Sequence, residues 1–147
     1  MSAVPTYPRA LVAAARADFA AQVAAYRDLV AAASKASGMS LVRIDAALAA
    51  FEPGCFNSLL VALDARFVHR VRDAGAAHGD ALDEVRLLVD AITTHGGVLR
   101  ADGSVAYDPA RSVLRIDFGD RVALNADDFE AIAAAFLGEI ERRHAAP

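Results

Sequence analysis

The chain has few of the residues on which several common protein classes depend. Cys55 is the only cysteine, so no internal disulfide can form, and no zinc-type set of cysteines and histidines accompanies it. We therefore expect Cys55 to be a small buried apolar residue. Lys35 is the only lysine, and 19 acidic against 15 basic residues give a net charge of −4. This charge disfavours nucleic-acid binding, because affinity for phosphate backbones rests on clustered positive charge.

Long apolar runs and the usual catalytic signatures are also missing. No apolar run reaches about 18 residues without interrupting charges, and the amino-terminal residues lack the layout of a secretory signal. A cytoplasmic protein without a membrane partner is expected. The sequence contains no phosphate-binding glycine loop and no serine nucleophile elbow. We therefore predict neither a cofactor nor a metal site, and classical hydrolase and nucleotide-binding functions have no support.

Apolar side chains recur at three- and four-residue spacing along most of the chain, with alanine at many positions between them. Alanine is the strongest helix former, so this pattern predicts amphipathic helices. The first helix begins at Pro8, which suits a first helical turn, and ends at the SKASG stretch. Three more follow: one from Ser40 to a break at Pro53-Gly54, one over about 55–74, and one from Asp80 to Gly96-Gly97.

The pattern changes between Val98 and Leu124. Short alternating runs flank an Asp-Gly turn at 102–103 and a Gly-Asp turn at 119–120, which is typical of β-hairpins. Asn125 then occupies an N-cap position before a last helix with two aspartates in its first turn.

These elements predict an α+β fold that is predominantly α. About five helices form a bundle, and a small antiparallel β-hairpin sheet is inserted before the last helix. A chain of 147 residues is the size of one domain, so residues 1–147 are expected to form a single helical unit. Within it, 8–96 hold four helices, 97–124 the hairpins and 125–145 the carboxyl-terminal helix.

Several strings of the sequence carry a family resemblance. CFNSLLVALDARFVHRVRD at 55–73 is followed by LDEVRLLVDAI, GGVL, SVLRI and FGDRVALN. Together they resemble an uncharacterised bacterial family of about this length, with an aromatic-Asn opening, a Phe-Val-His-Arg core and a Glu-Val-Arg segment. The resemblance covers roughly residues 51–144. It implies no known activity.

Polar residues on the predicted apolar helix faces are the candidates for a site. On a helical wheel, Asn57 and Asp64 fall inside the apolar arc of the third helix, whereas His69 lies on the opposite side. We therefore predict that Asp64 is more buried than His69. A buried polar group without a partner costs about 1–3 kcal/mol, so Asp64 needs one, such as Arg86 or a backbone group. Alternatively, Asn57, Asp64, Glu84 and Arg86 line a ligand-binding pocket.

Two weaker motifs point to other chemistry. Glu141 and His144 have the spacing of a di-metal ligand pair, but the second copy that such a site requires is missing. Arg72-Asp73 followed by His78 resembles the signature of the helical HEPN ribonucleases, whose arginine and histidine act on RNA phosphate. Gly75 interrupts this run and the chain is acidic, so an RNA-cleaving function is a remote alternative.

Two classes of function stay open at this point. The first is a non-enzymatic helical protein that acts through protein–protein interaction or self-association, with a homodimer expected. The second is a small-molecule-binding or catalytic protein with a polar pocket around Asp64. An alanine-lined side of the first helix favours the homodimer, because small residues allow helix backbones to approach closely. This side carries Ala10, Ala13, Ala17, Ala20, Ala24 and Ala31.

Overall fold

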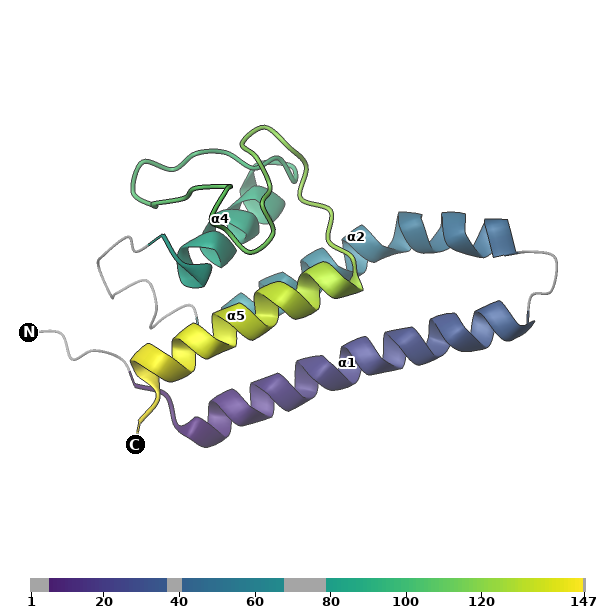
Figure 1. Cartoon of the computed structure of the whole chain (residues 1–147), viewed down its shortest axis with the longest axis horizontal. Helices are drawn as coiled ribbons and strands as arrows, with labels where there is room; N and C mark the ends of the chain where they lie inside the picture. Colours follow the sequence, from purple (N-terminus) through teal and green to yellow (C-terminus); the bar gives the residue numbers. More distant parts are fainter. Residues whose placement is uncertain (1–5, 37–40, 68–78, 147) are drawn as a thin grey trace, which may run out of the picture.

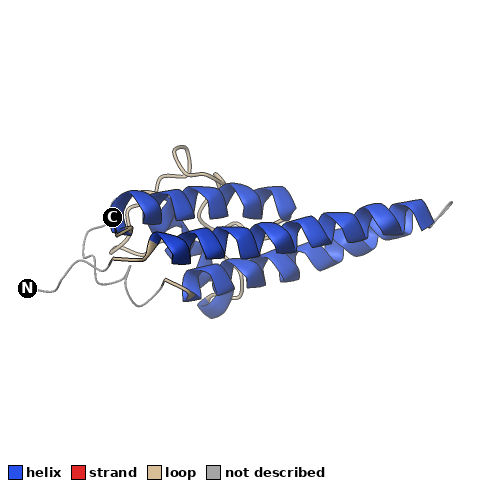
Figure 2. Ribbon diagram, turned by 90° about the horizontal axis from the view of Figure 1, so that it is seen from below, coloured by secondary structure: helices blue, strands red, loops and turns tan. Residues whose placement is uncertain are grey.

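The computed structural model describes residues 6–36, 41–67 and 79–146, and this part of the chain contains four helices (Figure 1). They are α1 (Arg9–Ala36), α2 (Leu41–Ala65), α4 (Ala81–Thr94) and α5 (Ala126–His144). α1, α2 and α5 pack against one another, and α4 packs against α2 and α5 (Figure 2). The predominantly helical architecture predicted from the sequence is confirmed.

The core forms where the apolar stripes of α1, α2 and α5 meet. Side chains at three- and four-residue spacing are buried there, which is the pattern of a helix with one covered face. They include Phe56, Leu60, Leu63 and Phe67 from the α2 side and Phe129, Ile132, Phe136 and Ile140 from α5. Asn125 caps α5 and Asp80 caps α4, as predicted. Asn125 also forms a capping box with Asp128, which was not predicted.

The predicted β-hairpin sheet is wrong. The described residues contain no strand, and the segment 97–124 is irregular with a single bridge between Val98 and Arg121. Its alternating apolar residues are buried one by one against the helices, among them Leu99, Val105, Val122 and Leu124. Three backbone hydrogen bonds join 97–99 to 119–122, which is too few for a ladder. Two helix side chains, Glu84 and Asn57, bind four further backbone groups of this segment, as described below.

The predicted helix break at Pro53-Gly54 is also wrong. α2 continues through Pro53, so the second and third predicted helices are one, and the described chain has four helices rather than about five. A proline inside a helix leaves the carbonyl four residues earlier without its bond. That carbonyl belongs to Ala49, which is exposed, so water can satisfy it. Cys55, next to this position, is half-buried rather than buried.

α1 and α2 run antiparallel and continue together well beyond α4 and α5 (Figures 1 and 2). We call this helix pair, residues 24–36 and 41–55, the arm. Its base still contacts the rest of the fold, since Tyr26 packs against the core and Arg27 pairs with α5. None of the arm residues whose exposure is described is buried. The arm includes much of Val42–Ala65, a stretch of α2 that is long and apolar enough to cross a membrane, judged by length and composition alone. Of its most apolar 18-residue window, 17% is buried.

Candidate functional site

Glu84 is a buried carboxylate in the middle of the fold. It lies on α4 and is 2% exposed. Its two oxygens accept hydrogen bonds from successive backbone amides, those of Val113 at 2.8 Å and Leu114 at 2.9 Å. Burial raises the pKa of Glu84, and the two amides act in the opposite direction. Glu84 therefore serves as an anchor for the irregular segment 97–124.

A second set of hydrogen bonds closes the loop that Glu84 holds. The Tyr107 hydroxyl donates to the carbonyl of Ile116 at 2.7 Å. The Ser112 hydroxyl accepts from the amide of Arg115 at 2.9 Å, and Arg115 has a left-handed backbone with φ 55°. A non-glycine residue in this region is held there by its surroundings. The path of the loop is therefore fixed by its own side chains together with Glu84 of α4.

Asn57 anchors the same segment from the other side. Its carboxamide nitrogen donates to the carbonyl of Val122 at 2.9 Å, and its oxygen accepts from the amide of Leu124 at 3.2 Å. A carboxamide that donates and accepts in this way supplies the backbone of this segment with the hydrogen-bond partners that a neighbouring strand would otherwise provide. Asn57 thus fixes the chain where it enters α5.

Replacing Asn57 by alanine is expected to lower the free energy of unfolding by about 1–3 kcal/mol, because two backbone groups lose their partner. Ser58→Ala is the matched control, since the Ser58 hydroxyl bonds only within its own helix, to the carbonyl of Gly54. The control should stay within about 0.5 kcal/mol of the wild type. Urea denaturation followed by circular dichroism measures both, and equal effects of the two substitutions would contradict the anchoring role.

The other predicted site residues occupy different places. Asp64 is half-buried in the last turn of α2, and its carbonyl accepts from the amide of Phe67 at 2.9 Å. His69 lies outside the described residues, so the burial comparison stays a prediction. Arg86 is exposed on α4 and lines a surface recess of about 270 Å³ with Leu87, Asp90 and Asp102.

In that recess the pKa of Asp102 is lowered, first by hydrogen bonds from the Ser104 amide and hydroxyl and further by the charge of Arg86. Of the four predicted pocket residues, the structure brings Asn57 and Glu84 to one segment of backbone and places Arg86 at a separate surface site.

The weaker motifs find ordinary structural partners where they are described. Glu141 pairs with Arg16 of α1 at 2.9 Å, and His144 is buried with its ring against that of Tyr7. Within the described ranges, no group of three or more histidine, cysteine, aspartate or glutamate side chains could hold a metal ion. The residues of the HEPN-like motif, 72–78, lie outside those ranges.

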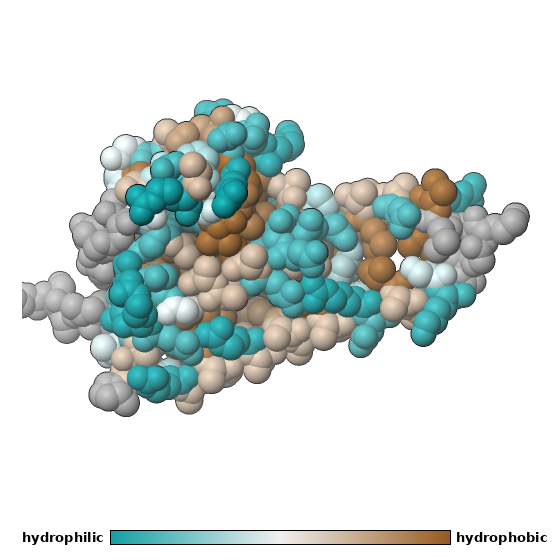
Figure 3. Space-filling view, viewed as in Figure 1, coloured by the Kyte–Doolittle hydropathy of each residue, from teal (hydrophilic) through white to brown (hydrophobic). Residues whose placement is uncertain are grey.

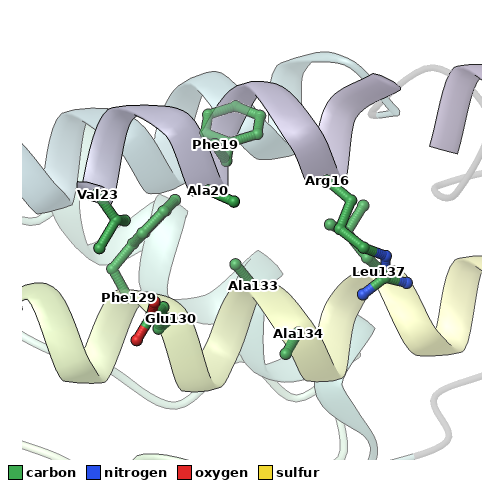
Figure 4. Close-up of a pocket in the computed structure, with 9 residues that line it drawn as sticks. All are labelled: Arg16, Phe19, Ala20, Val23, Phe129, Glu130, Ala133, Ala134 and Leu137. Carbon is green, nitrogen blue, oxygen red and sulfur yellow. The ribbon is translucent and has the colours of Figure 1, made fainter. Parts of the chain in front are cut away.

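A shallow crevice between α1 and α5 was not predicted. Its floor consists of Phe19, Val23, Phe129, Ala133 and Leu137, and its volume is about 130 Å³ (Figure 4). The charged residues at its rim are Arg16, paired with Glu141, and Glu130, paired with Arg27. With its rim charges already paired, the crevice presents an apolar lining and no free charged group for a substrate. The small residues Ala133 and Ala134 are the sequence signal that could have indicated it.

The arm is a second surface feature that sequence reasoning missed. Leu29 is 66% exposed, Val42 81% and Phe51 55%. Along the seam between the two helices, Tyr26 and Leu48 are only half-buried. Figure 3 shows the resulting apolar surface along the arm, in brown between the two helices. A helix pair that projects from the core with uncovered apolar side chains is typical of an interaction surface.

The chain matches no protein-family model, no curated protein and no solved structure. The resemblance of residues 51–144 to an uncharacterised bacterial family stays a prediction.

Proposed function

We propose that this protein acts through self-association, as a non-enzymatic helical interaction protein that forms a homodimer. The observation that carries the proposal is the arm, which continues both long helices beyond the core without a single buried residue among those described. Isolated helices are marginal in water, and most helical stability comes from packing an apolar face. An arm of this kind is best explained by a second protein surface that covers it.

The polar residues that would build a catalytic pocket support the same choice. The carboxylate of Glu84 and the carboxamide of Asn57 are both engaged with backbone groups of 113–124. Side chains used in this way have few remaining donors or acceptors for a substrate. Glu84 and Asn57 therefore act as structural anchors. The exposed apolar surface of the arm is then the feature that favours binding to a protein partner.

The expected result is a concentration-dependent mass. The molar mass measured by static light scattering should rise from the monomer value of 15.4 kDa toward twice that value as the protein concentration increases from about 1 to about 100 µM. The rise falls in this range because an interface of modest size gives weak association. High salt should not abolish the dimer, since apolar burial is not screened by salt. A monomer mass throughout this range would refute self-association.

A further inference from the structure

We infer that two copies of this chain associate through their arms, packed antiparallel about a two-fold axis so that the paired helices form a four-helix bundle. The inference rests on the proposed self-association and adds the surface and the arrangement.

The seam of the arm lacks the cover that a helix bundle supplies. Tyr26 and Val30 on α1 recur at four-residue spacing, as do Ile44 and Leu48 on α2, and all four are half-buried. Two helices alone can cover only one side of such a stripe, whereas four helices enclose it in a common core. A second arm laid on the first would complete the burial of the seam.

One side of the arm is built for close approach. Leu29 is flanked by Ala25 four residues before it and Ala32 three residues after it, and these two are exposed. Residues at these spacings share a helix face. A large apolar side chain between small ones forms both a knob and the holes beside it.

Phe51 on α2 is also flanked by small residues, with Ala47 four residues before it and Gly54 three residues after it, and its ring stacks on that of Tyr26 at 6.4 Å. Because α1 and α2 run in opposite directions, helical periodicity counted from the seam places Leu29 and Phe51 on the same side of the arm. That side therefore presents two large apolar side chains among small ones, and it can pair with an identical surface.

The distribution of charge along the arm selects the antiparallel arrangement. Near the tip, Lys35 and Arg43 outnumber Asp45. Glu52 lies near the base, and Asp28 lies between the base and the middle of the arm. Parallel arms would place like charges together, whereas antiparallel arms place the positive tip of one copy beside the acidic base of the other.

The base stays acidic in the folded chain because its one arginine is already neutralised. Arg27 pairs with Asp127 at 2.7 Å and with Glu130 at 2.8 Å, both on α5. The tip of a second copy would therefore meet acidic side chains there, which supports the antiparallel arrangement.

The dimensions of the arm indicate how stable the dimer is. Each helix of the arm is about 20 Å long and about 10 Å wide, so two arms would bury roughly 800–1,000 Å² in total. This is below the standard size of protein interfaces and in the class of weak, reversible complexes. Dissociation in the micromolar range is the consequence.

The test uses the full chain with one charge placed on the surface at a time. Leu29→Glu and Phe51→Glu should each raise the dimer dissociation constant at least about tenfold, because a carboxylate would be buried at the centre of the interface. Leu11→Glu is the matched control, since Leu11 is 41% exposed on α1 but lies outside the arm. It should stay within about twofold of the wild type. Circular dichroism verifies that all three variants fold.

The orientation is tested by a distance. In a Cys55→Ala background, a spin label on Arg9→Cys marks the start of α1. Pulsed electron–electron double resonance should give a distance of about 60 Å between the two spin labels of a dimer with antiparallel arms. This is twice the helical rise from residue 9 to the middle of the arm near residue 30. A separation below about 40 Å would overturn the antiparallel arrangement.

The outcomes separate the two proposals. A monomeric wild type refutes self-association and this inference together. A dimer that both arm variants leave unchanged refutes only the assignment to the arm. If the wild type is monomeric and sediments with phosphatidylglycerol vesicles, and the arm variants do not, then the arm binds lipid, and both proposals are overturned.

Discussion

Glu84→Ala is expected to lower the free energy of unfolding by about 2–4 kcal/mol at neutral pH. The substitution removes the acceptor for two backbone amides, those of Val113 and Leu114. Hydrogen bonds to a charged group contribute about 1.5–3 kcal/mol each, and a buried donor left alone costs about 1–3 kcal/mol. These two contributions describe partly the same interaction, so the expected loss is smaller than their sum. Urea denaturation followed by circular dichroism measures the loss.

Arg86→Ala is the control on the same helix. Arg86 is exposed two residues after Glu84, so its removal should change the free energy of unfolding by no more than about 0.5 kcal/mol. Glu84→Gln should fall between the two, because its carboxamide keeps one acceptor oxygen but turns donor hydrogens toward the other amide. A loss from Glu84→Ala no larger than that from Arg86→Ala would contradict the anchoring role.

The pH dependence gives the same prediction a second measurement. Burial raises the pKa of Glu84 above its ordinary value of 4.5, so the folded chain holds this proton more tightly than the unfolded chain. The stability that this proton adds is fully present below about pH 4.5 and is lost as the pH rises through the raised pKa. The stability difference between wild type and Glu84→Ala should therefore be larger at pH 4 than at pH 7. A stability difference between the two proteins that is larger at pH 7 than at pH 4 would contradict a raised pKa of Glu84.

The helices were predictable because their local signals agree. In α5, the N-cap at Asn125, the acidic first turn and the spacing of Phe129, Ile132 and Phe136 all indicate the same element. α4 begins at its predicted cap and ends one turn before Gly97. Where propensity, capping and apolar period coincide, sequence suffices to place an element.

The two errors in the fold have one physical origin, which is that tertiary surroundings decide between local alternatives. Pro53-Gly54 breaks most helices, but here the freed carbonyl is exposed and the helix continues. In 97–124, short alternating runs suit a strand, but a strand needs a backbone partner. Glu84 and Asn57 supply that partner instead, and their reach across about 30 and 65 residues leaves no local signal.

The candidate site shows a similar division. A polar residue in an apolar stripe signals a specific contact, and this identified Asn57 from the sequence. It did not identify the contact, because backbone amides and carbonyls are present at every position and carry no sequence signature. The arm was missed for a related reason: apolar spacing shows that a helix has a face to cover, not whether anything in the chain covers it.

Asp80→Ala is expected to lower the free energy of unfolding by about 2–4 kcal/mol, because Asp80 performs two functions at once. One carboxylate oxygen caps α4, accepting from the amides of Leu82 at 2.9 Å and Asp83 at 3.3 Å. The other pairs with Arg143 in the last turn of α5, and the side chains of this pair are 15% and 22% exposed. Loss of a cap costs about 0.5–2 kcal/mol, and loss of a partner from a mostly buried ion pair costs more.

Asp80→Asn separates the two functions. Asparagine is as good an N-cap as aspartate, so this variant keeps the cap and removes only the charge that faces Arg143. The free energy of unfolding of Asp80→Asn should therefore be about 0.5–2 kcal/mol higher than that of Asp80→Ala. In an Arg143→Met background the loss of stability caused by Asp80→Asn should nearly vanish, because Asp80 no longer has its ion-pair partner. Glu139 also pairs with Arg143, at 2.9 Å, but it loses this partner in both chains that are compared. Full persistence of that loss without Arg143 would show that the charge of Asp80 acts on its own helix and does not join α4 to α5.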